Sequence, residues 1–135
     1  MRLSYPAIFY PADEGGYTVV VPDLPGCVTE GDDLAEAILM GIDAASGWIL
    51  GEIEDNLPVP PPTPLNAVKP NKGQGAFVNI IALDIDEFAR KHGKRTVKRS
   101  ITIPAYLNTF AESQNINVSK FLQESLAEKY RQAHL

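Results

Sequence analysis

The sequence predicts an α+β protein of 135 residues, in which strands and helices occupy separate stretches of the chain. Three short β-branched runs open the chain, a long apolar helix follows, and two helical segments close it. A proline-rich connector at residues 58–64 interrupts this order. These patterns predict a first domain at residues 1–94, which contains the connector, and a second domain at residues 95–135.

The first domain begins with three predicted antiparallel strands that are joined by tight turns. Residues 5–10 and 17–21 are rich in aromatic and β-branched side chains, and the acidic and glycine residues 13–16 form a turn between them. A second turn at residues 22–26 leads into a short third strand at residues 27–31. The short spacings predict a meander.

A long helix is predicted from Asp33 to about Glu54. Asp33 and Glu36 have the spacing of a capping box, with Asp33 as the cap. The apolar positions then recur with helical period; they are Leu34, Ala37, Ile38, Gly41, Ile42, Ala45, Trp48 and Ile49. The prolines of residues 58–64 prevent helix, so we expect a stiff spacer, with a ligand for an aromatic-lined groove as the alternative.

Residues 76–83 predict a fourth strand that returns to the first sheet. Asp84 and Glu87 repeat the capping spacing and open a short helix, which Gly93 is suited to end. A basic cluster follows, and a DNA backbone is expected to pass along it; the alternative is an ordinary solvated surface. Its members are Arg90, Lys91, Lys94, Arg95, Lys98 and Arg99.

Charge divides the chain into two halves of opposite sign. Residues 1–64 contain one basic and eleven acidic residues, a net charge of −10. Residues 65–135 contain eleven basic and six acidic residues, a net charge of +5. This asymmetry predicts a basic partner for the front and a polyanion for the back. The alternative is that the polarity serves solubility or contact between the two halves.

Several classes of protein are disfavoured by composition. No run of eighteen apolar residues suggests a membrane span, and the N-terminus lacks the apolar core of a signal peptide. Cys27 is the single cysteine and is expected to be a small buried residue. His92 and His134 lack ligand partners at metal-binding spacing. We therefore expect a cytoplasmic protein without metal, cofactor or membrane contact.

The second domain depends on the alternating run 97–103. Pro104 stops this predicted strand and starts a helix. Two helices with apolar stripes follow, formed by Leu107, Phe110 and Ala111 and by Val118, Phe121, Leu122, Ser125, Leu126 and Tyr130. About forty residues without disulfide or metal cannot bury a sufficient core alone. We therefore predict an obligate homodimer in which two 97–103 strands pair antiparallel.

The paired strands form a ribbon that fits the major groove of DNA. The pattern resembles the ribbon-helix-helix (Arc/MetJ-like) fold, a β-ribbon reader of DNA. The resemblance implies base reading by Lys98, Ser100 and Thr102. It implies a phosphate clamp at Asn117, Val118 and Ser119, to which Lys120 adds charge. Arg99 departs from the family pattern, because it stands at an inward position where the family has an apolar residue.

The front of the chain resembles the N-terminal domain of HicB antitoxins. The resemblance is carried by Tyr-Pro-Ala-Ile-Phe-Tyr from Tyr5, by Gly-Tyr-Thr-Val-Val-Val-Pro-Asp-Leu-Pro-Gly-Cys from Gly16, and by Glu-Gly-Asp-Asp-Leu-Ala-Glu-Ala from Glu30. It extends to about Phe88. It implies a partial RNase H-like β-β-β-α-β(-α) domain that binds HicA, a small basic toxin that cleaves mRNA with a histidine. HicB proteins often carry a ribbon-helix-helix tail.

This resemblance makes an antitoxin and autorepressor the favoured function. Asp23, Glu30 and Asp32 are the expected toxin contacts. One rival is a stand-alone repressor whose front domain senses a ligand or oligomerises. For either function, the dimers would form tetramers if front domains also pair. The other is a metal-dependent nuclease, but the first strand has no carboxylate and we predict no catalytic residue. Whether residues 90–96 are ordered without DNA is left open.

Overall fold

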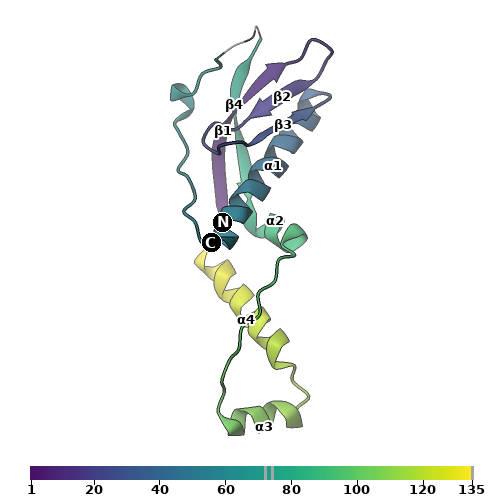
Figure 1. Ribbon diagram of the computed structural model, residues 1–135, viewed down its shortest axis with the longest axis vertical. Helices are drawn as coiled ribbons and strands as arrows, with labels where there is room; N and C mark the ends of the chain where they lie inside the picture. The colour runs from purple at the N-terminus through teal and green to yellow at the C-terminus, as the bar shows by residue number, and fades with distance from the viewer. Residues whose placement is uncertain (72, 74, 135) are drawn as a thin grey trace. The chain divides into compact units, whose positions relative to one another are not determined.

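The computed structural model describes residues 1–71, 73 and 75–134, and it divides the chain into two compact units. The first unit is Arg2–Gly93, and the second begins at Lys94 (Figure 1).

The first unit contains a four-stranded antiparallel sheet in the order β3-β2-β1-β4 (Figure 1). The strands are β1 (Arg2–Pro11), β2 (Tyr17–Val20), β3 (Val28–Gly31) and β4 (Phe77–Asp84). The predicted meander and the returning fourth strand are therefore confirmed. β4 pairs with β1 from Arg2↔Asp84 to Phe9↔Phe77, and this long pairing extends β1 beyond its predicted bounds.

One face of this sheet is covered by α1 (Leu34–Glu54). The predicted cap is present, because Asp33 Oδ1 accepts a hydrogen bond from the Glu36 N–H at 2.8 Å. Glu36 Oε1 in turn accepts from the N–H of Asp32 at 3.2 Å, one residue before the cap. Small residues bring the helix close to the strands: a Cβ atom on Gly41 would lie 3.2 Å from Val19 Cγ1.

By length and composition alone α1 is able to cross a bilayer. One side of α1 packs within the unit, where Ala37, Ala45 and Ile49 are completely buried. Asp43 also interrupts the apolar sequence, in agreement with the absence of a continuous run of eighteen apolar residues.

A short second helix, α2 (Ile85–His92), follows β4 directly. Asp84 Oδ1 caps it by accepting from the Glu87 N–H at 3.1 Å, as the spacing predicts. Gly93 is the C-cap, with an ordinary φ of −76°. Glycine is needed there for space, because a Cβ atom would lie 2.5 Å from the carbonyl oxygen of Ala89.

The second unit contains α3 (Ala105–Ser113) and α4 (Val118–Ala133). Pro104 precedes α3 as its N-cap, and Asn117 Oδ1 caps α4 by accepting from the Lys120 N–H at 3.0 Å. Residues 97–103 form no strand. A strand is defined by hydrogen bonds to a neighbour, and the described residues of one chain provide none for this segment, so the ribbon stays a prediction.

Candidate functional site

In the structure the connector extends beyond the prolines of residues 58–64 to residues 57–71, and side chains hold it against its own sheet. The Tyr5 hydroxyl donates to the carbonyl oxygen of Pro60 at 2.6 Å. The Tyr10 hydroxyl donates to Asn71 Oδ1 at 3.0 Å. A short 3₁₀ turn, Leu65–Ala67, lies between these anchors. The predicted stiff spacer is therefore part of the first unit, and sequence reasoning missed the tyrosines that hold it.

Asp23 supplies the third anchor of the connector. Its Oδ2 accepts a hydrogen bond from the Thr63 N–H at 2.9 Å, and its Oδ1 accepts from the Thr63 hydroxyl at 2.5 Å. Both groups are half-buried. This carboxylate was predicted to contact a toxin, but within the first unit its oxygens already serve the fold.

Tyr5 is completely buried, and its pKa is raised. Burial is the larger cause, and the negative charge of Asp23 is the second. The phenolate is disfavoured in the folded state. Tyr5 therefore makes its full contribution to the free energy of unfolding at pH values below its unfolded pKa of about 10. That contribution is lost as the pH rises through the higher folded value.

We therefore expect the urea midpoint to fall between about pH 9 and 11. The Tyr5→Phe variant should lose part of this dependence, because it has no phenol to ionise. Tyr106→Phe is the matched control, since Tyr106 is 73% exposed. Urea titrations at several pH values measure the effect, and equal pH slopes for Tyr5→Phe and the wild type would contradict it.

The sheet face opposite α1 carries two rows of side chains, which the strand register defines. One row is Ile8, Val20 and Val28, and the other is Tyr10, Thr18 and Glu30. Together with the connector this face encloses an open groove of about 730 Å³, here called the connector groove. Its lining residues are Ile8, Tyr10, Thr18, Val20, Pro22, Val28, Thr63, Ala67, Val68, Lys69 and Asn71.

The three predicted toxin contacts do not form one cluster. Glu30 is exposed on β3 and shares the face of the connector groove through its pairing with Thr18. Asp32 is exposed in the turn before α1. Asp23 lies in the loop at the other end of the β2–β3 pair, where it binds Thr63. Glu30 stands beside Thr18 of the groove and Asp23 binds the lining residue Thr63, whereas Asp32 lies in the turn beyond β3.

Trp48 and Cys27 have structural positions in the first unit. The Trp48 Nε1–H donates to the carbonyl oxygen of Pro25 at 3.0 Å, which ties the β2–β3 loop to α1. Trp48 was predicted to lie in the core and is half-buried. Cys27 is buried as predicted, and burial raises the pKa of its thiol, which disfavours the reactive thiolate.

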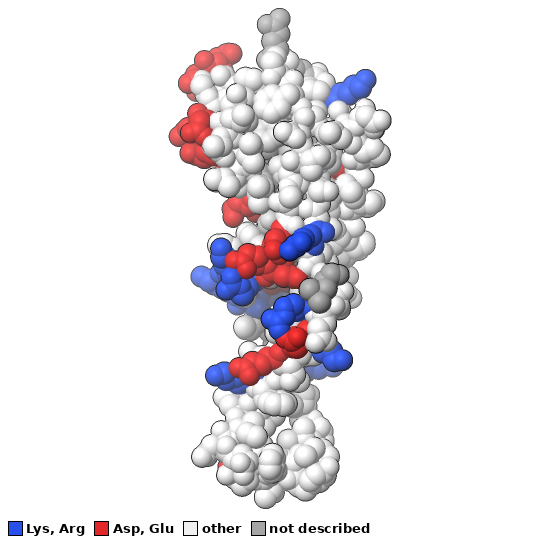
Figure 2. All heavy atoms as spheres, turned by 180° about the vertical axis from the view of Figure 1, so that it is seen from behind, with Lys and Arg blue, Asp and Glu red and all other residues white. Residues whose placement is uncertain are grey.

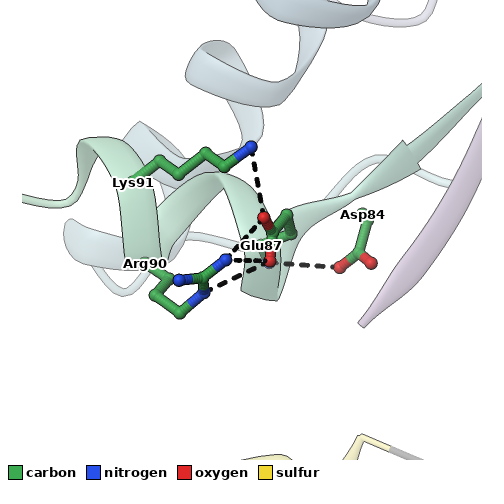
Figure 3. A network of polar contacts seen from close by, with 4 residues as sticks. All are labelled: Asp84, Glu87, Arg90 and Lys91. Carbon is green, nitrogen blue, oxygen red and sulfur yellow. Dashed lines mark hydrogen bonds and ion pairs between the residues drawn. The ribbon is translucent and has the colours of Figure 1, made fainter.

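The predicted basic cluster is divided between the two units. Figure 3 shows that Arg90 and Lys91 both bind Glu87 on α2, at 2.6 and 3.2 Å. The hydrogen bond from Arg90 is the largest cause that lowers the pKa of Glu87. Lys98 and Arg99 belong to the second unit and are exposed.

The predicted DNA-reading residues are accessible in the second unit. Lys98, Ser100 and Thr102 are all exposed. At the start of α4, Asn117 satisfies the Lys120 N–H, whereas helix geometry leaves the first N–H groups without intrahelical acceptors. Those groups belong to Val118 and Ser119, the remaining members of the predicted phosphate clamp. Their role in DNA binding stays a prediction.

The helices of the second unit expose most of their apolar side chains. Tyr106, Phe110, Phe121 and Leu126 are 73%, 56%, 63% and 60% exposed. Ala111 is buried, but none of the described residues of α4 is. In the described chain this unit therefore has almost no core of its own.

Comparison with known proteins gives one family. The model described as "HicB_like antitoxin of bacterial toxin-antitoxin system" matches residues 5–126. Antitoxin HicB of Escherichia coli K12 is 40% identical over 65 residues, which are 48% of this chain and 47% of that protein. An uncharacterised 14.9 kDa protein of Haemophilus phage HP1 is 34% identical over 93 residues, 68% of this chain and 67% of that protein.

The fold is also found among solved structures. The "Toxin-Antitoxin complex from Streptococcus pneumoniae" contains a chain that matches with a TM-score of 0.61 and 24% identity, over 96% of this chain and 99% of that one. The part of this chain that aligns with the Escherichia coli HicB antitoxin spans about half the length of that antitoxin. Because the family match covers nearly all of the two units, this chain belongs to the HicB-like antitoxin family of bacterial toxin–antitoxin systems.

Proposed function

We propose that this protein is an antitoxin that neutralises a HicA-type mRNA-cleaving toxin and represses its own operon. The charge of each unit supports the assignment of these two functions to different units. Arg2–Gly93 contains five basic and fourteen acidic residues, whereas the chain from Lys94 onward contains seven basic and three acidic residues. An acidic unit suits a basic toxin, and a basic unit suits DNA.

The toxin is assigned to the first unit. One similar structure, the "HicA3 and HicB3 toxin-antitoxin complex", supports a HicA-type partner for this chain. Neutralisation by covering the active site of the toxin needs no catalytic residue. The carboxylates of Asp23, Asp33 and Asp84 are hydrogen-bonded within the unit, which favours a binding role over the metal-dependent nuclease. The cytoplasm contains both mRNA and operator, so we place the protein there.

Co-expression tests the toxin assignment. The full chain should restore growth to cells that express the small basic protein encoded beside its gene. It should also stop mRNA cleavage by that purified protein at a stoichiometric ratio. Continued cleavage in excess antitoxin would overturn the assignment. A stand-alone repressor has no such neighbouring reading frame.

The second unit is assigned to the operator and to dimerisation. In the proposed homodimer two 97–103 segments pair as a ribbon-helix-helix, and the exposed apolar faces of α3 and α4 pack against the partner chain. Lys98, Ser100 and Thr102 then face the bases. The N-terminus of α4 binds a phosphate through Asn117, Val118, Ser119 and Lys120. If the first units of two dimers also pair with each other, a tetramer forms.

Thr102→Ala is expected to weaken operator binding by about 1–3 kcal/mol, because the hydroxyl loses its base contact. Gel-shift titrations at two salt concentrations measure this, since salt separates phosphate contacts from base contacts. Thr109→Ala is the matched control, because the Thr109 hydroxyl binds the carbonyl oxygen of Ala105 in its own helix. Unchanged affinity in both Ser100→Ala and Thr102→Ala rejects the ribbon face.

A further inference from the structure

We propose that the toxin docks on the sheet face opposite α1, with an apolar side chain over Val28 and the connector groove and a basic side chain at Glu30. The proposal rests on the toxin partner proposed above. It replaces the scattered acidic contacts predicted from sequence with one continuous surface. Val28, Glu30 and the connector groove are called the docking face below.

The first argument is that this face is built as an interface but is incompletely covered. α1 buries the opposite face, on which Val19 and Phe9 are almost fully buried. On the docking face Val28 is 56% exposed, although it stands in register with the apolar residues Val20 and Ile8. Val28 extends the apolar lining of the groove to its exposed rim, so that the groove can receive a partner's anchoring side chain.

The second argument is the rigidity of the connector, which forms one wall of the groove. Thr63 and Asn71 fix this wall through Asp23 and Tyr10. Because the wall is pinned on both sides of the 3₁₀ turn, binding requires little ordering of the connector. Asp23 thus supports the proposed interface by holding Thr63 in the wall.

The third argument is charge. Glu30 is exposed on the edge strand, in the same row as Thr18 of the groove. Figure 2 shows acidic side chains at one edge of the first unit, beside a broad area without charged side chains. Lys69 lies on the connector wall of the groove. A basic partner therefore places its cations toward Glu30 and its apolar residue toward the wall, which sets the orientation of docking.

The outer surface of α1 provides a matched comparison. Leu39 is 66% exposed there, a fraction similar to that of Val28. It lies on a convex helix, away from the groove residues. Lysine at either position adds one positive charge and therefore weakens long-range attraction to a basic partner about equally. If the toxin binds at the docking face, Val28→Lys also blocks the site of the toxin's apolar side chain.

Isothermal titration of the full chain with the purified toxin tests the proposal. Val28→Lys should weaken binding at least about 30-fold, which is the effect expected of an interface hot spot. Leu39→Lys should stay within about threefold of the wild type. Glu30→Gln should reduce the association rate and its dependence on salt, which stopped-flow mixing at two salt concentrations measures. Circular dichroism melts establish that each variant is folded, and Glu30→Lys replaces Val28→Lys if the latter is not.

The outcomes separate the two proposals. If the wild type binds the toxin and Val28→Lys binds equally well, the docking face is wrong and the antitoxin function stands. A greater loss in Leu39→Lys than in Val28→Lys also rejects the docking face. If the wild type neither binds nor inhibits the toxin, the proposed function is overturned, and the docking face with it.

Discussion

Alanine at Gly31 is expected to destabilise the first unit by about 3 kcal/mol, the upper range for overpacking a tight site. A Cβ atom there would lie 2.3 Å from the backbone nitrogen of Ala37 and 2.6 Å from its Cα. These are backbone atoms of α1, which cannot move aside as a flexible side chain does. β3 and α1 would therefore have to separate, and the urea midpoint should fall steeply.

Gly51→Ala is the matched control for this change. Gly51 also lies in the first unit, but a Cβ atom there would meet nothing within 4 Å. Alanine is favoured over glycine inside a helix by about 0.5–1 kcal/mol, so this variant should be slightly more stable than the wild type. Equal midpoints for Gly31→Ala and Gly51→Ala would show that the close approach of β3 to α1 is not tight.

Lysine at Leu126 is expected to abolish the proposed dimer and, with it, operator binding. Leu126 is 60% exposed on α4, and the dimer would bury it. Truncating a buried leucine costs about 2–5 kcal/mol, and an unpaired buried charge costs more. In a symmetric dimer the penalty applies to both chains. Sedimentation analysis should find monomers at concentrations where the wild type is dimeric.

Ala127→Lys distinguishes the loss of the dimer from the effect of the added positive charge. Ala127 is the next residue of α4, is exposed, and lies outside the apolar stripe. Both variants add one positive charge, which by itself strengthens contact with DNA. Retained binding by Ala127→Lys and lost binding by Leu126→Lys would identify dimer loss as the cause. A dimeric Leu126→Lys protein would show that this face of α4 is not the interface.

The parts of the fold that could be predicted from the sequence depend on neighbouring residues. Asp33 and Asp84 were each predicted as caps, and each accepts a hydrogen bond from the N–H three residues later. Such contacts need only the local chain, so the residue type at a fixed spacing is sufficient. The turn that separates β1 from β2 is equally local.

The connector groove could not be predicted, because its contacts join distant residues. Thr63 binds Asp23 across forty positions, and Pro60 binds Tyr5 across fifty-five. The positions of Thr63 and Pro60 in the sequence do not indicate which residues they contact. For the same reason the sequence predicted Asp23 as a toxin contact and gave no indication that it binds Thr63. The proposed 97–103 ribbon depends on a contact that is absent from the sequence of one chain, because its partner strand would belong to a second molecule.

The strand order β3-β2-β1-β4 has a consequence for how the chain is made and folds. β1 pairs with β2 across a short turn, from Pro11↔Tyr17 to Ile8↔Val20, whereas its pairing with β4 joins Leu3 to Leu83. Contacts so distant in sequence form slowly, because a long loop must close first. A nascent or prematurely ended chain therefore presents the free edge of β1, and such edges recruit other strands. Aggregation should be greatest for fragments that stop before Phe77.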